Sequence, residues 1–550
     1  MSYPTVIRWP KNRSRTFLRK LGRPDNSKTL FLLQGPVGPF FKHLSRAASA
    51  AGFNPVKINF NGADWFFSRK VPRINFTGDP DTWAAWFEHL TDFCKPAGIV
   101  VMGDVRPLHR AAIEIARARN IPVFCFEEGY IRPDFVTLEE GGVNAFSPVR
   151  SFINDLARRE EFLATAPVVS GEHKVFGGNP FLNMAGFAIL YFWAMSLGRP
   201  FYRKYRHHRQ RPLVTEFFLW TRALTLKISR FWGNRKTNRH LIEKFDKRFF
   251  VVALQVSDDV QLTVHGRGWS NERTISLTIA SFAQFADPAD RLVIKGHPQD
   301  RGHTLHRSYV RRVAEIAGCE GRVDYVDDGS IGHLLSHSKG LLTINSTAGV
   351  SALFHGVPLM AFGDGLYSDP DLVTFADSAE ALDRFWCEAR PADPTLVAAF
   401  LGHIRHGSLV NGSFYQPSAR RFTAQKAMEK IAARLNGNAS RIAPAAEAEP
   451  ATIAVLRPDT DSAASGTIPA QAAVRQQGRN KTDTFAQQNR VYRPAGAETS
   501  AKMVPRRELE RGIQIVFPSQ GWPVWPAAST GAAIAAADNC AKRHGAKGTA

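Results

Sequence analysis

Cysteine is scarce in this chain of 550 residues. Its five cysteines are scattered, and no two of them form a Cys-x-x-Cys pair: Cys94, Cys125, Cys319, Cys387 and Cys540. A disulfide scaffold or a zinc site needs cysteines at paired spacings, so this distribution disfavours both. It suits a protein that works in a reducing compartment.

Acidic residues are also few in relation to basic ones. The chain has 49 Asp and Glu against 71 Lys and Arg, which gives a net charge of +22 and a pI near 10.0. This balance indicates an acidic partner: nucleic acid, anionic lipid, or a phosphorylated or carboxylated substrate. The nucleic-acid interpretation rests on charge alone, because no helix-turn-helix, RRM, zinc-finger or KH signature accompanies it.

The sequence lacks an apolar run long enough to span a membrane comfortably. A spanning helix needs about 20 apolar residues, whereas the apolar run at Ala185–Met195 has eleven. Residues 175–198 carry no charge, which favours a helix that lies in a membrane interface or re-enters it. The stretch from Met1 to Lys28 is basic and has no apolar core, so we expect no signal peptide.

A basic and aromatic segment follows the apolar run. Residues 199–248 contain fifteen Lys or Arg and three acids, a net charge of +12, with aromatic residues between them. Helices that combine basic residues with Trp and Phe are typical of segments on an anionic bilayer surface. The alternative is an internal helical subdomain whose charges are solvated. We predict that residues 172–248 form a helical insert at a membrane surface.

Several common catalytic and metal-binding patterns are missing. The sequence has no P-loop, HExxH, GxSxG or EF-hand pattern. Two Asp-Pro-Asp triplets, Asp79–Asp81 and Asp369–Asp371, fit an Asp-x-Asp metal pattern formally. Such pairs are frequent by chance, and the proline between the acids suits a turn. We therefore expect neither a metal ion nor a cofactor.

Apolar strand patterns alternate with helical patterns in two parts of the chain, which predicts parallel sheets with crossover helices. The expected strands are Leu30–Gln34, Val56–Phe60, Gly98–Met102 and Ile121–Phe126, then Phe249–Val256, Arg291–Lys295, Val323–Val326, Gly340–Ile344 and Pro358–Phe362. We predict an α/β protein with two Rossmann-like domains, 28–171 and 249–375, facing a cleft. Helices at 376–439 are expected to close the structure, and the composition of 440–550 predicts a disordered tail.

A serine and a threonine stand where a strand of the second domain gives way to a helix. The segment Asn345-Ser346-Thr347-Ala348-Gly349 follows an apolar strand. The free amides and the positive dipole at such a helix start attract phosphate. An ordinary Ser/Thr helix cap is the alternative.

A second candidate element lies upstream in the same domain. Lys295-Gly296-His297-Pro298 follows a predicted buried strand, and the proline holds His297 extended at the strand end. In open α/β sheets ligands bind at this edge. We therefore predict a nucleotide-phosphate site that contains Lys295, His297, Pro298, Ser346, Thr347 and Gly349.

The first domain has two adjacent carboxylates, Glu127 and Glu128, at the end of a predicted strand. In an extended segment they face opposite ways, so one can point into a cleft while a neighbour such as Arg132 holds the other. A carboxylate in a dry cleft can serve as general acid, base or nucleophile. Gly129 lets the backbone turn and approach a ligand. A solvated acidic turn is the alternative.

The loop Gln34-Gly35-Pro36-Val37-Gly38 follows the first predicted strand. It does not meet the dinucleotide fingerprint GxGxxG. It can cradle the phosphate of an acceptor, and a simple tight turn is the alternative.

Taken together, these motifs resemble those of bacterial capsular polysaccharide biosynthesis proteins over roughly residues 28–435. They are, in order, Gln34–Phe41, Gly103–Pro107, Glu127–Asp134, Thr137–Glu139, Gly142–Asn144, Gln255–Asp258, Lys295–Pro298 and Asn345–Thr347. The acidic-acidic-Gly, His-Pro and Ser-Thr triplet is also similar to that of bacterial sialyltransferases, which use another CMP-linked keto sugar acid.

The resemblance implies a GT-B-like fold and a retaining glycosyltransferase. Such an enzyme would move Kdo from CMP-Kdo, as a β-Kdo, to a phosphatidylglycerol-type lipid and so start the linker of a group 2-type capsule. It implies a peripheral location on the cytoplasmic face of the bacterial inner membrane, beside other capsule assembly and ABC-transporter components. A non-catalytic adaptor for capsule export and a nucleic-acid binder remain as alternatives.

The resemblance also implies roles for particular residues. Glu128 matches the catalytic acidic position, where relatives carry aspartate, and Glu127 is the alternative, with Arg132 beside them. Glutamate is one methylene longer than aspartate. This sequence therefore departs from its relatives at the position that would act as nucleophile or general base. Further cleft positions are Gln34, Gly35, Asp104, Gln255 and Asp258.

Overall fold

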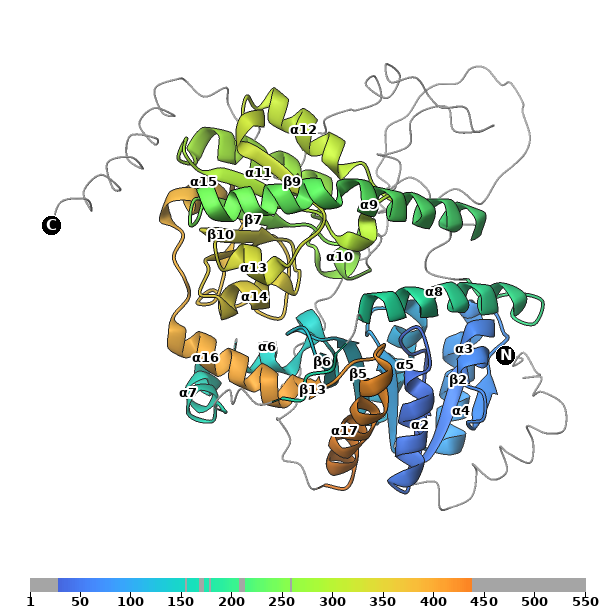
Figure 1. The fold of residues 1–550 in the computed structure, drawn as a ribbon. Coiled ribbons are helices and arrows are strands. Elements are labelled where there is room, and N and C mark those ends of the chain that lie inside the picture. Colours follow the sequence, from blue (N-terminus) through green and yellow to red (C-terminus); the bar gives the residue numbers. More distant parts are fainter. Residues whose placement is uncertain are drawn as a thin grey trace, which may run out of the picture. The chain divides into compact units, whose positions relative to one another are not determined.

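Two β-sheets organise the chain (Figure 1). The computed structural model describes residues 28–153, 156–167, 173–177, 180–206, 213–257 and 260–437, which all belong to one compact body. Below, each of its two sheets with the helices around it is called a unit. Asp258 and the predicted tail lie outside the described residues.

The first sheet has seven strands in the order β13-β6-β5-β4-β1-β2-β3. They are β1 (Thr29–Leu32), β2 (Asn54–Asn59), β3 (Arg73–Asn75), β4 (Gly98–Met102), β5 (Val123–Glu128), β6 (Phe135–Glu140) and β13 (Leu409–Asn411). The strands from β5 to β3 are parallel, and β6 and β13 add antiparallel pairs. Strands β1 and β4 are buried along their length, as expected for parallel strands with helices on both faces.

The second sheet has six strands in the order β12-β11-β10-β7-β8-β9, and all its pairs are parallel. They are β7 (Phe249–Ala253), β8 (Arg291–Lys295), β9 (Val323–Val326), β10 (Gly340–Thr343), β11 (Leu359–Ala361) and β12 (Thr374–Phe375). Both sheets contain the Rossmann strand order, so the predicted α/β class with two Rossmann-like units is confirmed. Their switch points lie between β1 and β4 and between β7 and β10.

Helices cover both sheets. Those of the first unit are α2 (Phe40–Ala50), α3 (Gly62–Phe67), α4 (Trp83–Cys94), α5 (Pro107–Arg117), α6 (Pro148–Ile153) and α7 (Leu156–Ala164). Those of the second are α10 (Val260–His265), α11 (Asn271–Phe285), α12 (His306–Ile316), α13 (Ile331–Leu335), α14 (Ala348–Phe354) and α15 (Ala379–Glu388).

The end of the described chain returns to the first sheet. After α16 (Pro394–His403), β13 pairs with β6, and α17 (Pro417–Leu435) packs against α2. Helix α15 instead packs on α11 of the second unit. The helices expected at 376–439 are therefore divided between the two units.

The segment between the units forms two long helices, α8 (Pro180–Leu197) and α9 (Leu213–Lys244). Helix α8 packs closely on α3. A Cβ added to Gly62, the first residue of α3, would lie only 2.6 Å from the Cα of Gly198, just after α8. Helix α9 packs beside β9, and Arg230 and Asn234 donate hydrogen bonds of 2.8 Å to Asp327. Among the described residues, no helix has both the length and the apolar character that a membrane crossing requires.

Candidate functional site

Polar bonds tie the strand ends together at the switch point of the second sheet. The side-chain oxygen of Gln255, just after β7, accepts a hydrogen bond from the backbone N–H of Asn345 over 3.4 Å. The Ser257 hydroxyl donates to Asp300 over 2.8 Å. These bonds bring the loops after β7, β8 and β10 to one edge of the sheet, where ligands bind in such folds.

Lys295 is the last residue of β8, and its side chain is buried. The residue is only 6% exposed, and the ammonium makes no hydrogen bond or ion pair with any residue that the structure describes. Burial lowers the pKa of Lys295 to about 8, although Asp328 and Asp327 favour the charged form. A buried charge without a partner is costly, so this position favours an anionic ligand.

His297 stands two residues further on as a neutral imidazole. Burial, Arg132 and Lys295 together lower the pKa of His297 to about 4. Its Nδ1 accepts a hydrogen bond of 3.2 Å from the backbone N–H of Gln299, in the short turn that starts at Pro298. The proton of the neutral ring is therefore on Nε2, which can donate to an oxygen of a ligand.

The Ser-Thr segment starts α14, which has seven residues. The Ser346 hydroxyl accepts a hydrogen bond of 3.2 Å from the backbone N–H of Ala348, and the Thr347 side chain makes no capping bond. A Cβ on Gly349 would lie 2.3 Å from the ring of Tyr367. Packing against this ring explains the glycine, and the Ser346 bond is a local cap of the kind considered above.

Glu127 and Glu128 have different partners at the end of β5. A carboxylate oxygen of Glu127 accepts a hydrogen bond of 3.0 Å from the backbone N–H of Glu128. The Glu128 carboxylate accepts one of 2.9 Å from the hydroxyl of Tyr415, in the returning C-terminal segment. Arg132 donates to the carbonyl oxygen of Gly129 over 3.0 Å. The partner found for Glu128 is thus Tyr415, which no local sequence pattern indicates.

The structure explains why residue 129 is a glycine, which the sequence alone does not. A Cβ at this position would lie 2.2 Å from the carbonyl oxygen of Phe135. The glycine therefore allows the tight connection between the antiparallel strands β5 and β6. Close approach of a ligand is not needed to explain it.

The switch point of the first sheet holds a second polar cluster. Arg106, after β4, donates a hydrogen bond of 3.1 Å to the side-chain oxygen of Gln34, after β1. The Gln34 amide nitrogen donates to Tyr191 of α8 over 2.8 Å and approaches Asp64 at 3.3 Å. Arg106 is half-buried and makes no ion pair with any described residue, so its charge is available to an anion. The sequence analysis included this arginine in the motif Gly103–Pro107 but assigned it no role.

The other predicted residues of the first domain have roles within the fold. Asp104 is buried and accepts a hydrogen bond of 2.8 Å from the backbone N–H of Val143. A Cβ on Gly35 would lie 2.6 Å from the ring of Phe41. Asp104 thus orders the loop beside Arg106, and Gly35 allows α2 to pack against the loop after β1.

The acidic motif and the segment that follows it lie near residues of the second unit. Arg132 lies near enough to His297 to lower its pKa. Arg150, in α6, pairs with Asp364 over 2.9 Å, and the ring of Phe146 lies 4.7 Å from that of His265. The carboxylates and the buried Lys295 therefore belong to neighbouring parts of the structure.

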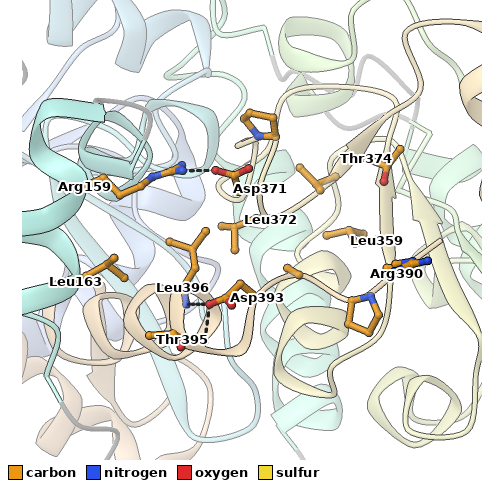
Figure 2. A pocket seen from close by; sticks show the side chains of 14 residues that line it. Arg159, Leu163, Leu359, Asp371, Leu372, Thr374, Arg390, Asp393, Thr395 and Leu396 are labelled. Carbon is orange, nitrogen blue, oxygen red and sulfur yellow. Dashed lines mark hydrogen bonds and ion pairs between the residues drawn. The ribbon is translucent and has the colours of Figure 1, made fainter. Parts of the chain in front are cut away.

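A pocket lies away from these residues. It has a volume of about 560 Å³ and is lined by residues of α7 and α16, by Leu359 and by the segments Pro370–Thr374 and Arg390–Asp393. Figure 2 shows Arg159 reaching Asp371 and the carboxylate of Asp393 capping the start of α16. None of the predicted site residues lines the pocket. In the described part of the chain, no group of three or more His, Cys, Asp or Glu side chains could hold a metal ion.

Two Rossmann-like units, completed by a C-terminal helix that returns to the first, define a GT-B-like α/β protein. The sequence model of the family described as capsule polysaccharide biosynthesis protein matches residues 97–415. The chain belongs to this family.

Two relatives in sequence agree with this assignment. The chain is 34% identical over 390 residues to the capsule polysaccharide export protein KpsS of Escherichia coli, covering 71% of this chain and 97% of that protein. It is 30% identical over 400 residues to the capsule polysaccharide modification protein LipB of Neisseria meningitidis serogroup A, covering 71% and 92%. Among solved structures, the Thermosulfurimonas dismutans KpsC beta Kdo 2,7 transferase is similar with 14% identity and a TM-score of 0.34, covering 75% of this chain and 100% of that one.

Proposed function

We propose that the protein is a glycosyltransferase that moves Kdo from CMP-Kdo to a phosphatidylglycerol-type lipid and so starts the linker of a capsular polysaccharide. The observation that carries the proposal is the buried residue Lys295, whose ammonium pairs with no residue that the structure describes, beside the neutral His297, whose pKa is lowered in part by Arg132 of the acidic motif. This arrangement suits an anionic leaving group next to a carboxylate.

In this proposal the second unit binds the donor. The Lys295 ammonium and the Nε2–H of His297 meet the phosphate of CMP, and the hydroxyls of Ser346 and Thr347 lie after β10, which β7 separates from β8 in the sheet. Donors already aimed at this phosphate stabilise the charge that develops when the bond to the sugar breaks. CMP then leaves as the anion.

The first unit supplies the carboxylate. Glu128 is the proposed nucleophile or general base, and Glu127 is the alternative. Retention of configuration requires either a covalent sugar–enzyme step or attack from the face that CMP leaves. In both cases the acceptor hydroxyl oxygen bonds to the anomeric carbon, and its proton passes to a base.

The acceptor is proposed to enter at the switch point of the first sheet. The half-buried Arg106 is free of ion pairs with described residues, so it can meet the phosphodiester of the lipid beside Gln34. A lipid acceptor of this kind implies work at the cytoplasmic face of the inner membrane, beside other capsule assembly components. No cofactor or metal is required in this scheme.

The test is release of CMP from CMP-Kdo by the purified protein, with and without phosphatidylglycerol vesicles. Lipid-dependent CMP release and a lipid product heavier by one Kdo would support the proposal. A second candidate function, a non-catalytic export adaptor, is favoured by the name of the Escherichia coli relative, a capsule polysaccharide export protein. An adaptor would bind lipid-linked polysaccharide and release no CMP.

A further inference from the structure

Helix α8 has one apolar stripe that no described part of the protein covers. The helix carries no charged residue from Pro180 to Leu197. Its exposed large side chains recur at helical spacing and are Leu182 (63%), Ile189 (63%), Leu190 (40%), Trp193 (65%) and Leu197 (73%). Leaving such a stripe in water is unfavourable, and contiguous exposed apolar surface marks an interaction site.

The opposite side of the same helix is fixed to the first unit. Tyr191 is buried and receives hydrogen bonds of 2.8 Å from Gln34 and Asn61. The rings of Phe67 and Tyr191 stack with centroids 6.4 Å apart. The helix therefore lies along the protein and presents its apolar stripe outward as a fixed surface.

Basic side chains without acidic partners come from three elements beside α8. We call them the basic collar: Lys42 and Arg46 of α2, Arg69 and Lys70 after α3, and Arg420 and Arg421 of α17. None of the six makes an ion pair with any residue that the structure describes.

One contact places the collar beside α8, and a second observation shows that its cations lie near one another. The guanidinium of Arg420 lies 5.0 Å from the centroid of the Phe187 ring, which belongs to α8. The cations also repel one another: burial, then Arg46, Lys70 and Arg69, lower the pKa of Lys42. Clustered cations repel one another, and an anionic partner would relieve this repulsion.

We propose that α8 and the basic collar form a docking surface for an anionic phospholipid bilayer, with the apolar stripe among the acyl chains and the collar at the headgroups. An apolar helical face flanked by Lys and Arg is the chemistry of helices that lie in a membrane interface. A nucleic acid would use the cations but leave the stripe exposed.

The surface also explains how a lipid could reach the site. Tyr191, on the protein side of α8, bonds to the same Gln34 that receives the hydrogen bond of Arg106. Docking through α8 therefore brings the switch point of the first sheet next to the bilayer. This step deepens the proposed function, yet membrane docking itself requires no sugar transfer.

Helix α9 is a weaker candidate for the same role. It also exposes apolar side chains, among them Ile228 (68%) and Trp232 (73%). However, its Arg222 and Arg230 are used within the fold, where they bond to the carbonyl oxygen of Gly302 and to Asp327. Deleting the insert would remove these bonds and those of Tyr191, so point substitutions are the sharper test.

The experiment is co-sedimentation of the full chain with vesicles, without any sugar donor, so that its outcome is independent of catalysis. We expect binding to vesicles that contain phosphatidylglycerol and little binding to phosphatidylcholine alone. The double variants Ile189→Ser/Trp193→Ser and Arg46→Glu/Arg69→Glu should each weaken binding by roughly tenfold or more. The side chains of Ile189, Trp193, Arg46 and Arg69 are all exposed. We therefore expect the temperature of thermal unfolding to change little in either double variant.

Matched controls lie on the second unit. Ile316→Ser/Phe354→Ser removes apolar side chains of similar exposure, 52% and 62%. Arg384→Glu/Arg390→Glu reverses two exposed arginines that make no ion pair with described residues. Both controls should bind like the unchanged protein. Equal binding by the α8 and collar variants, equal loss in the controls, or tighter binding to duplex DNA than to the vesicles at matched salt would overturn the proposal.

Discussion

The hydroxyl of Tyr415 donates a hydrogen bond of 2.9 Å to the carboxylate of Glu128, although 287 positions separate the two residues in the sequence. Burial and the charge of Glu128 raise the pKa of Tyr415 well above its usual value. The phenol therefore keeps its proton and acts only as a donor to the carboxylate. The candidate catalytic group is thus oriented by the segment that follows the second unit.

This bond predicts a selective effect of Tyr415→Phe, because phenylalanine fills the same buried space without the donor. A hydrogen bond to a charged group contributes about 1.5–3 kcal/mol, which corresponds to a loss of roughly 10- to 150-fold in rate. Steady-state kinetics should show a lower kcat and an unchanged KM for CMP-Kdo. An unchanged kcat would show that Tyr415 does not position Glu128.

The two glutamates can be separated by charge-removing variants that keep their shape. Glu128→Gln is expected to abolish Kdo transfer while CMP binding, measured by calorimetry, survives. Glu127→Gln serves as the control, since its carboxylate bonds to a neighbouring backbone amide. A dead Glu127→Gln with an active Glu128→Gln would exchange the assignments, and activity in both would rule out a carboxylate mechanism.

Lys295 should give the reaction a basic limb in its pH profile. Because its pKa is lowered to about 8, the ammonium is charged below this pH and loses its proton as the pH rises through it. The value of kcat/KM, which reports the free enzyme, should fall above pH 8. In Lys295→Arg the cation stays charged, so the limb should disappear; its persistence would assign it to another group.

His297 should act as a neutral donor over the whole physiological range. Its pKa near 4 means that it binds no proton between pH 5 and 8, so donor affinity should show no step near pH 6.5. His297→Ala should weaken CMP-Kdo binding by about 1.5–3 kcal/mol with the fold intact. The depressed pKa also makes folding less favourable as the pH falls from 6.5 through 4. Equal donor affinity in the variant would contradict the assignment.

Glu139 is expected to be a stability residue, not a catalytic one. It is buried and accepts hydrogen bonds of 2.7, 2.6 and 2.6 Å from the hydroxyls of Tyr130, Ser147 and Ser408. Glu139→Gln leaves hydroxyl donors poorly satisfied and should cost about 1–3 kcal/mol in urea unfolding. The neighbouring Glu140→Gln breaks only a partly exposed pair with Arg434 and should cost at most about 1 kcal/mol. Equal losses would show that the buried network contributes nothing special.

The strands that carry the site could be predicted because buried parallel strands appear in the sequence as continuous apolar runs. The predicted strand ending at Lys295 coincides with β8, and the others of both sheets lie within a few residues of their observed bounds. The antiparallel strand β13 has three residues, too few for a periodic pattern. Its pairing with β6 is decided by contacts between distant segments.

Site partners were harder to predict than site positions. The motif residues around Glu128 and Lys295 are local in sequence, whereas Tyr415 and Arg106 act through tertiary contacts. The sequence shows where the glycines are but not what requires them. Gly349 packs against the ring of Tyr367, and Gly129 lies against the carbonyl oxygen of Phe135. The absence of charge in α8 was visible in the sequence, whereas its one-sided packing on α3 needed the structure.

The return of β13 and α17 to the first sheet has a consequence for how the protein is made. Until residues 409–411 have left the ribosome, one edge of β6 stays unpaired, and until residue 435 has left it, α2 lacks the full helix that packs on it. The first unit to be synthesised is therefore the last to be finished. A fragment that ends before residue 409 should aggregate through this open edge, whereas its solubility should recover when residues 409–435 are supplied.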